Sequence, residues 1–93
     1  MQQNKIIVHG IHYVFTTHAV TVMTERNIPV EWIEQVLKSP NQTEDDRHDG
    51  ELKHFLRVIK ENDNRILRVV TNDHSQPKRI VTLFFDRKQR KKL

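Results

Sequence analysis

Cysteine is absent from this chain of 93 residues, which excludes a disulfide framework and any metal site built on thiolates. Glycine and proline are scarce, at two and three residues, and this composition is untypical of a disordered chain. The longest apolar run, residues 80–85, is far shorter than the roughly 20 residues that a helix needs to span a bilayer. These absences predict a globular protein that does not insert into a membrane.

The beginning of the sequence does not resemble a signal peptide. The first ten residues, MQQNKIIVHG, lack the apolar core and small-residue cleavage site of a signal peptide. We therefore expect a cytoplasmic protein. Its length predicts one domain over residues 1–93.

The motifs of many enzyme classes are absent as well. The sequence has no glycine-rich phosphate loop, no nucleophile elbow, no HExxH and no other clear metal-ligand spacing. We therefore expect neither a metal nor a cofactor. Metal-independent RNA cleavage remains, because it needs only a base for the 2′-hydroxyl, an acid for the leaving oxygen and cations for the phosphorane.

Positive charge is concentrated at the C-terminus. Five of the 16 Lys and Arg residues lie within residues 87–92, RKQRKK, so the rest of the chain carries 11 against 12 Asp and Glu. A basic tail over residues 87–93 is typical of proteins that bind nucleic acid or another acidic partner. A solvated terminus without a function would have the same composition, and both interpretations stay open.

The first 39 residues predict a strand region followed by two helices. Residues 5–15 are rich in β-branched and aromatic side chains, and Gly10 divides them into one irregular strand or two short ones. Residues 16–39 predict a helical hairpin. Thr16 or Thr17 can cap its first helix, and Asn27 can adopt the left-handed conformation that ends it.

The remainder, residues 42–86, predicts an antiparallel sheet. Residues 52–60 and 65–71 alternate as strands of a hairpin, and the apolar run in residues 79–86 predicts a central strand covered on both faces. The acidic residues 41–51 suit a short strand or an edge loop. The expected fold class is therefore α+β, with two N-terminal helices packed on a curved antiparallel sheet of three to five strands.

Histidines and arginines are the residues that could cleave RNA. His18, in the first turn of the first helix, or His54 could move protons. Arg26, Arg57 or Arg68 could hold a phosphate, and Arg87 and Lys88 begin the basic tail and could bind substrate. The structural alternatives are that His18 caps and packs its turn, and that Arg26, which falls in the apolar stripe of its helix, is a buried anchor.

Two separated motifs carry a family resemblance. Thr17-His18-Ala19, Glu25-Arg26-Asn27-Ile28-Pro29 and Glu31-Trp32-Ile33 resemble the "HA…eRgIp.ewi" pattern of the family called domain of unknown function 4258. Leu67-Arg68-Val69-Val70 and the segment VTLFFDR, residues 81–87, resemble that family's later strands. The resemblance covers residues 15–88.

That family resembles a branch of the RelE/ParE- and BrnT-like toxins, some of which cleave RNA. The resemblance implies the same RelE/BrnT-like fold class and makes His18, Arg26, Arg68 and Thr82 candidates for function. Asn27 stands where the family usually has glycine. Val22 stands where many members carry another arginine, which would remove a phosphate ligand.

We therefore expect a toxin-like, metal-independent endoribonuclease with His18, His54, Arg68 and Thr82 as catalytic candidates. Arg26, Arg57, Arg87 and Lys88 are the expected substrate-binding residues. RNA and an antitoxin protein are the expected partners. The alternative is a non-catalytic module of the same fold that binds protein or nucleic acid.

Overall fold

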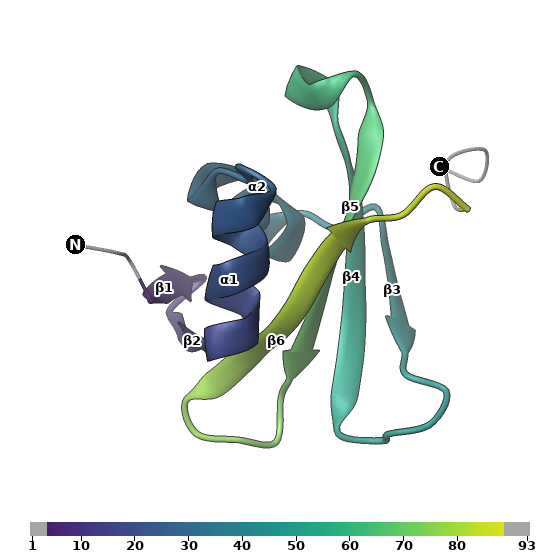
Figure 1. The fold of residues 1–93 in the computed structure, drawn as a ribbon. Coiled ribbons are helices and arrows are strands. Elements are labelled where there is room, and N and C mark those ends of the chain that lie inside the picture. The colour runs from purple at the N-terminus through teal and green to yellow at the C-terminus, as the bar shows by residue number, and fades with distance from the viewer. Residues whose placement is uncertain (1–3, 89–93) are drawn as a thin grey trace.

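A single hydrogen-bonded sheet forms the largest part of the computed structural model, which describes residues 4–88. Within these residues six strands lie in the order β1-β2-β6-β5-β4-β3 (Figure 1). Two α-helices and one short 3-10 helix, Lys60–Asn62, accompany them. In chain order the other elements are β1 (Lys5–Val8), β2 (Ile11–Phe15), α1 (Thr17–Glu25), α2 (Val30–Lys38), β3 (Gln42–Asp45), β4 (Leu52–Ile59), β5 (Arg65–Asn72) and β6 (Lys78–Phe85).

The N-terminal strand region forms a hairpin. His9 and Gly10 both have positive φ, at 53° and 76°, which is the conformation that a tight two-residue hairpin turn requires. β1 and β2 pair antiparallel on either side of this turn. β2 then pairs with β6 in parallel, with Phe15 opposite Ile80, because the chain makes a long crossover through the rest of the domain between these strands.

The expected fold class, with an antiparallel sheet of three to five strands, is therefore wrong. The sheet of residues 4–88 is mixed, has six strands and dominates the two helices. Residues 5–15, which were expected to form one irregular strand or two short ones, form the two strands β1 and β2. The polar β3 joins through its backbone, opposite residues 53–56 of β4, although its side chains have little strand preference.

Helix α1 begins at the expected cap and lies beside β6. Thr16 Oγ1 accepts a hydrogen bond from Ala19 N (3.1 Å) and donates one to the Val81 carbonyl of β6 (2.9 Å). Asn27 follows the helix with a φ of 53°, as expected for a residue that ends a helix. α1 follows β2 in the chain and packs beside β6 (Figure 1). Among the described residues, no helix is long and apolar enough to cross a membrane.

One face of the sheet and both helices enclose the hydrophobic core. The strands contribute Leu67, Val69 and Leu83, and α2 contributes Ile33 and Val36; all five are almost fully buried. At one end of this core the rings of Trp32 and Phe85 meet edge to face, with their centroids 6.2 Å apart.

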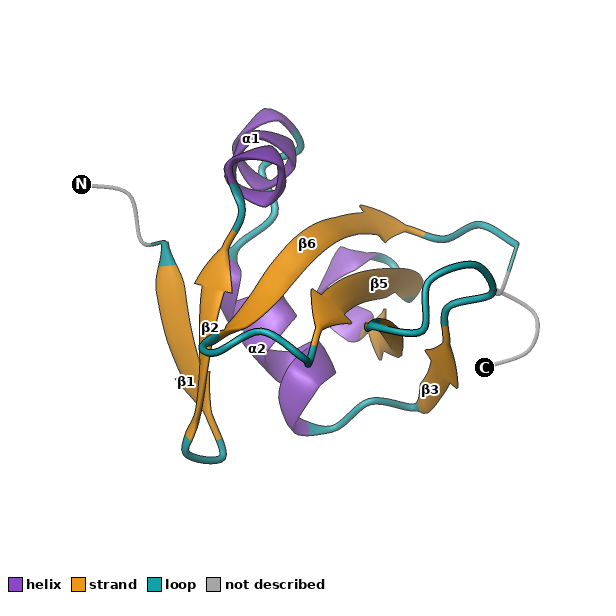
Figure 2. Cartoon of the chain, turned by 90° about the horizontal axis from the view of Figure 1, so that it is seen from below, coloured by secondary structure: helices purple, strands orange, loops and turns teal. Residues whose placement is uncertain are grey.

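Side chains that alternate with these core residues point to the opposite face of the sheet. They include Arg68 and Val70 on β5 and Thr82 and Phe84 on β6. α1 lies beside β6 (Figure 2), and its His18 reaches Thr82; on this face Arg68 and Val70 are buried, but Phe84 is not. The expectation that residues 79–86 are covered on both faces is therefore wrong, and Phe84 is 41% exposed.

Candidate functional site

We call the side chains that point away from the core on β3, β4, β5 and β6 the open face. The strand register aligns Glu44 with His54, His54 with Val70, and Val70 with Thr82. Paired Cα atoms in antiparallel strands are about 5 Å apart, so His54 and Thr82 lie about 10 Å apart. Arg68 lies two residues before Val70 on β5, so it is a diagonal neighbour of His54 on β4 and of Thr82 on β6.

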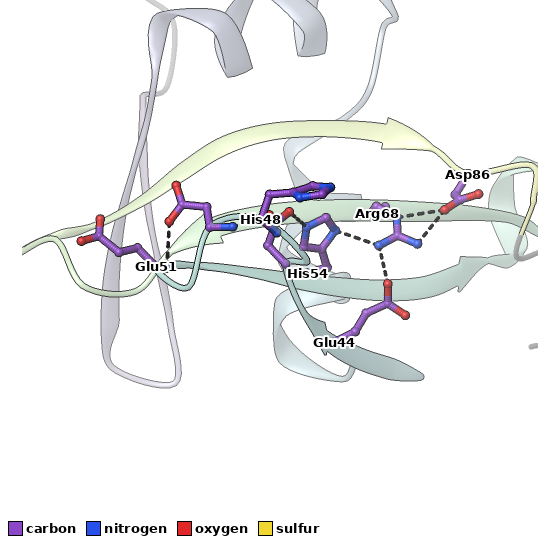
Figure 3. Close-up of polar contacts among 8 residues, drawn as sticks. Glu44, His48, Glu51, His54, Arg68 and Asp86 are labelled. Carbon is purple, nitrogen blue, oxygen red and sulfur yellow. Dashed lines mark hydrogen bonds and ion pairs between the residues drawn. The ribbon is translucent and has the colours of Figure 1, made fainter.

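Arg68 is the centre of a polar cluster on the open face (Figure 3). Its Nε and Nη2 contact Asp86 Oδ2, at 2.9 and 2.7 Å, and its Nη1 donates to Glu44 Oε1 at 2.9 Å. The side chains of Arg68 and Asp86 are only 8% and 10% exposed, whereas that of Glu44 is 38% exposed. The pair with Asp86 is therefore the buried one, and Glu44 adds a partner at the rim.

His54 extends the cluster to a third carboxylate. Arg68 Nη1 also donates to His54 Nδ1 at 2.7 Å, and His54 Nε2 lies 2.7 Å from Asp46 Oδ1. Because an arginine cannot accept a hydrogen bond, Nδ1 must be the acceptor, which assigns the neutral tautomer with its proton on Nε2. We call Glu44, Asp46, His54, Arg68 and Asp86 the arginine network.

The network shifts the pKa values of Asp46, Glu44 and Arg68. The hydrogen bond from His54, helped by the backbone N–H of His48, lowers the pKa of Asp46 to about 2. The hydrogen bond from Arg68 lowers the pKa of Glu44. Burial opposes the charge of Arg68, but its hydrogen bonds to Glu44 and Asp86 raise the pKa of the guanidinium. The network is thus held together by charges that persist at neutral pH.

His18 approaches the open face from the first turn of α1. Its Nε2 lies 3.1 Å from Thr82 Oγ1, and its side chain is exposed. The hydroxyl can either donate to this nitrogen or accept from it. No hydrogen bond within residues 4–88 engages Nδ1 of His18. His18 therefore combines a fixed ring position with a nitrogen that solvent or a ligand can reach.

The four expected catalytic residues thus lie on or against one face, in two contacting pairs. His18 contacts Thr82, and His54 contacts Arg68. Arg68 cannot serve as the expected open phosphate ligand, because four of its five N–H groups already point to acceptors of the network. In this structure it positions His54 and ties β5 to the end of β6.

Two of the expected substrate-binding residues lie elsewhere. Arg26 is exposed at the C-cap of α1 and not in the apolar stripe, because the helix ends at Glu25 before the stripe reaches it. Arg57 lies three residues after His54 on β4, so its side chain points to the other face of the sheet. There its Nη1 donates a hydrogen bond to the Ser39 carbonyl. Neither residue joins the open face.

Arg87 and Lys88 do reach it. Both are exposed and, with Phe84, line a hollow of about 400 Å³ that also contacts His54 and Arg68. A second hollow of about 350 Å³ adjoins it on the side of β3 and the loop after it. The remainder of the basic tail, from residue 89, lies outside the described residues.

Several residues of this site were not predicted from the sequence. Asp86 is the next-to-last residue of the segment VTLFFDR, and its position in that motif was the available signal. Asp46 and Glu44 lie in an acidic segment without periodicity, so only the pairing of β3 with β4 reveals that they flank His54. Phe84 was predicted to be buried.

Comparison with known proteins identifies the family of the chain. The model of the family described as "Domain of unknown function (DUF4258)" matches residues 15–85, so the chain belongs to this family. No curated protein and no solved structure matches the chain. Among residues 4–88, no group of three or more His, Asp or Glu side chains is arranged to hold a metal ion.

Proposed function

We propose that this member of the DUF4258 family is a metal-independent ribonuclease that binds RNA along the open face. The observation that carries the proposal is the contact between His18 and Thr82, which holds an exposed imidazole at the edge of the open face. Arg87 and Lys88 add positive charge to the same face at the end of β6. Histidine is the side chain most often used for proton transfer near neutral pH.

In the proposed reaction His18 takes the proton of a ribose 2′-hydroxyl. The 2′ oxygen then attacks the adjacent phosphorus, the bond to the 5′ oxygen breaks, and this leaving oxygen takes a proton from water. The products are a 2′,3′-cyclic phosphate and a 5′-hydroxyl. Arg87 and Lys88 hold phosphates further along the strand, so we expect most of the acceleration to come from proton transfer, about 100- to 10,000-fold.

The test is cleavage of single-stranded RNA in the presence of EDTA. We expect the wild type to cleave and His18→Ala to lose at least about 100-fold of the rate. His12→Ala, which removes an exposed histidine from β2, is the matched control and should cleave normally. Equal cleavage by the wild type and His18→Ala would identify a contaminating nuclease and refute the proposal.

The biological setting that we propose is a cytoplasmic toxin that a protein antitoxin neutralises. Its support is the resemblance of the family, stated above, to RelE/ParE- and BrnT-like toxins, some of which cleave RNA. Expression of the chain should then arrest growth, whereas His18→Ala should not. Co-expression of the protein encoded by the adjacent gene should relieve the arrest, and arrest by His18→Ala equal to that of the wild type would contradict the setting.

The second candidate function is a binding module without catalysis, and the arginine network favours it. His54 and Arg68 have their hydrogen-bonding groups occupied by carboxylates, as in a structural cluster. This function predicts that the protein binds an oligonucleotide or a protein but leaves RNA intact. The cleavage assay with His18→Ala, combined with a binding measurement, separates the two functions.

A further inference from the structure

We propose that Phe84 is a stacking platform for one base of a single-stranded RNA that lies along β6. The inference rests on the proposed function for the identity of the ligand, and it adds the single-stranded state and the position of a base. Phe84 is a large apolar side chain that the fold does not bury. Phe84 is 41% exposed, although its neighbour Phe85 is packed against Trp32 and Arg65.

The neighbours of Phe84 complement a nucleotide. The guanidinium carbon of Arg68 lies 6.0 Å from the ring centroid, which places the buried network on one side of the ring. Besides the paired Arg68 and Asp86, two exposed cations, Arg87 and Lys88, line the hollow of about 400 Å³ beside Phe84. An aromatic ring next to a positively charged groove is the arrangement with which proteins bind single strands without reading their sequence.

The adjoining hollow has the opposite balance and indicates where the strand would not lie. Four carboxylates and three cations line it; the carboxylates are Glu44, Asp45, Asp46 and Asp86. A phosphate backbone is repelled by this surface and attracted by the side that carries Arg87 and Lys88. Charge therefore favours a path along β6 over a path across β3.

The path along β6 also connects the stacking position to the proposed reactive group. Residues two apart on a strand share a face and lie about 7 Å apart, so Phe84 lies between Thr82 and the end of β6. His18 contacts Thr82, and Arg87 and Lys88 follow the end of the strand. A base stacked on Phe84 would thus place one neighbouring phosphate toward His18 and the other toward the cations.

A duplex cannot offer such a base without unpairing, because its bases are stacked on each other. A single strand can present the face of any base to the ring. The structure therefore favours a single-stranded RNA, with little dependence on sequence.

The test measures binding without cleavage. A fluorescein-labelled 2′-O-methyl oligoribonucleotide, which lacks the attacking hydroxyl, is titrated with full-length protein and followed by fluorescence anisotropy. We expect Phe84→Ala and Phe84→Leu to weaken binding by about tenfold or more, and Phe84→Trp to retain it. The matched control is Ile11→Ala, which removes a side chain of similar exposure, 39%, from β2 and should bind as the wild type does.

A second readout reports stacking directly. With 2-aminopurine in the oligonucleotide, binding to the wild type should quench its fluorescence, and binding to Phe84→Leu should not. Circular dichroism and thermal unfolding check that each variant is folded. Unchanged affinity in Phe84→Leu, or an absence of binding by the wild type at about 100 μM, would overturn the inference; the second result would instead assign the exposed ring to a protein partner.

The outcomes for the stacking site and for the ribonuclease are distinguishable. Binding that depends on Phe84, together with intact RNA in the cleavage assay, would support the stacking site and refute the ribonuclease. Cleavage that depends on His18 but binding that is indifferent to Phe84 would support the ribonuclease and refute the stacking site.

Discussion

Replacing Arg68 with methionine removes the centre of the arginine network and keeps most of the aliphatic stem. The change removes the buried cation that contacts the carboxylate of Asp86, whose side chain is 10% exposed. Removing one member of a buried ion pair costs about 3 to 5 kcal/mol. Asp86 retains a hydrogen bond from the backbone N–H of Lys88, so we expect the lower end, about 3 kcal/mol. A domain of this length has roughly 5 to 14 kcal/mol of stability, and the variant should still fold.

The contribution of Glu44 should be much smaller. Its side chain is 38% exposed, and ion pairs of this exposure contribute up to about 1 kcal/mol. Glu44→Gln should therefore lose less than Arg68→Met. In the double variant Arg68→Met/Asp86→Asn the buried charge is gone as well, so it should be at least as stable as Arg68→Met alone.

Urea unfolding followed by the fluorescence of Trp32, the one tryptophan of the chain, measures these differences. The matched control is Arg57→Met on the other face of the sheet, which removes a hydrogen bond to a backbone carbonyl and should cost about 1 to 2 kcal/mol. A loss in Arg68→Met no larger than in Arg57→Met would refute the reasoning, because the network would then contribute no more than a surface contact.

Three further predictions concern titration and capping. Asp46 and Glu44 have lowered pKa values in the folded state, so the unfolded state binds more protons in acid. The free energy of unfolding should therefore fall as the pH drops from about 4.5 toward 2. Asp46→Asn should reduce the dependence of the urea midpoint on pH across this window. Burial, with a smaller contribution from Asp73, raises the pKa of Tyr13; its ultraviolet titration should have a midpoint above 10.0, with stability lost as the pH rises beyond that value. Thr16→Ala should cost about 1 to 2 kcal/mol in thermal or urea unfolding because it removes the cap of α1 and the bond to Val81, whereas a similar loss in the exposed Thr17→Ala would contradict the assignment of the cap.

Side-chain alternation predicted much of the sheet and part of the site. It predicted a strand over residues 65–71, and the structure confirms this strand as β5 (Arg65–Asn72), with Leu67 and Val69 in the core and Arg68 on the opposite face. The helix signals at Thr16 and Asn27 were also correct. These features depend on the period of one segment or on one residue's conformational preference, which a single sequence contains.

The features that could not be predicted depend on pairing between distant segments. The parallel pairing of β2 with β6 and the addition of β3 are made by backbone hydrogen bonds, which leave no pattern in the side chains. Asp46 and His54 are eight residues apart, and only the hairpin of β3 and β4 brings them together. Arg26 was misplaced for a local reason, since a helix one residue longer would have carried it into the apolar stripe.

The hydrogen bonds on the open face indicate which of the two histidines, His18 or His54, has a ring nitrogen available to a substrate. His54 has both ring nitrogens engaged, by Arg68 and Asp46, so proton transfer at His54 would first have to break a contact of the network. His18 is held by one hydrogen bond to Thr82 and is exposed. If the network is structural, Arg68→Met should lower stability while the folded protein keeps the RNA cleavage that we propose for it, and His18→Ala should do the reverse. These opposite effects would separate a structural role of the network from a role of His18 in cleavage. A loss of cleavage in proportion to the loss of stability in both variants would instead assign a structural role to His18 as well as to the network.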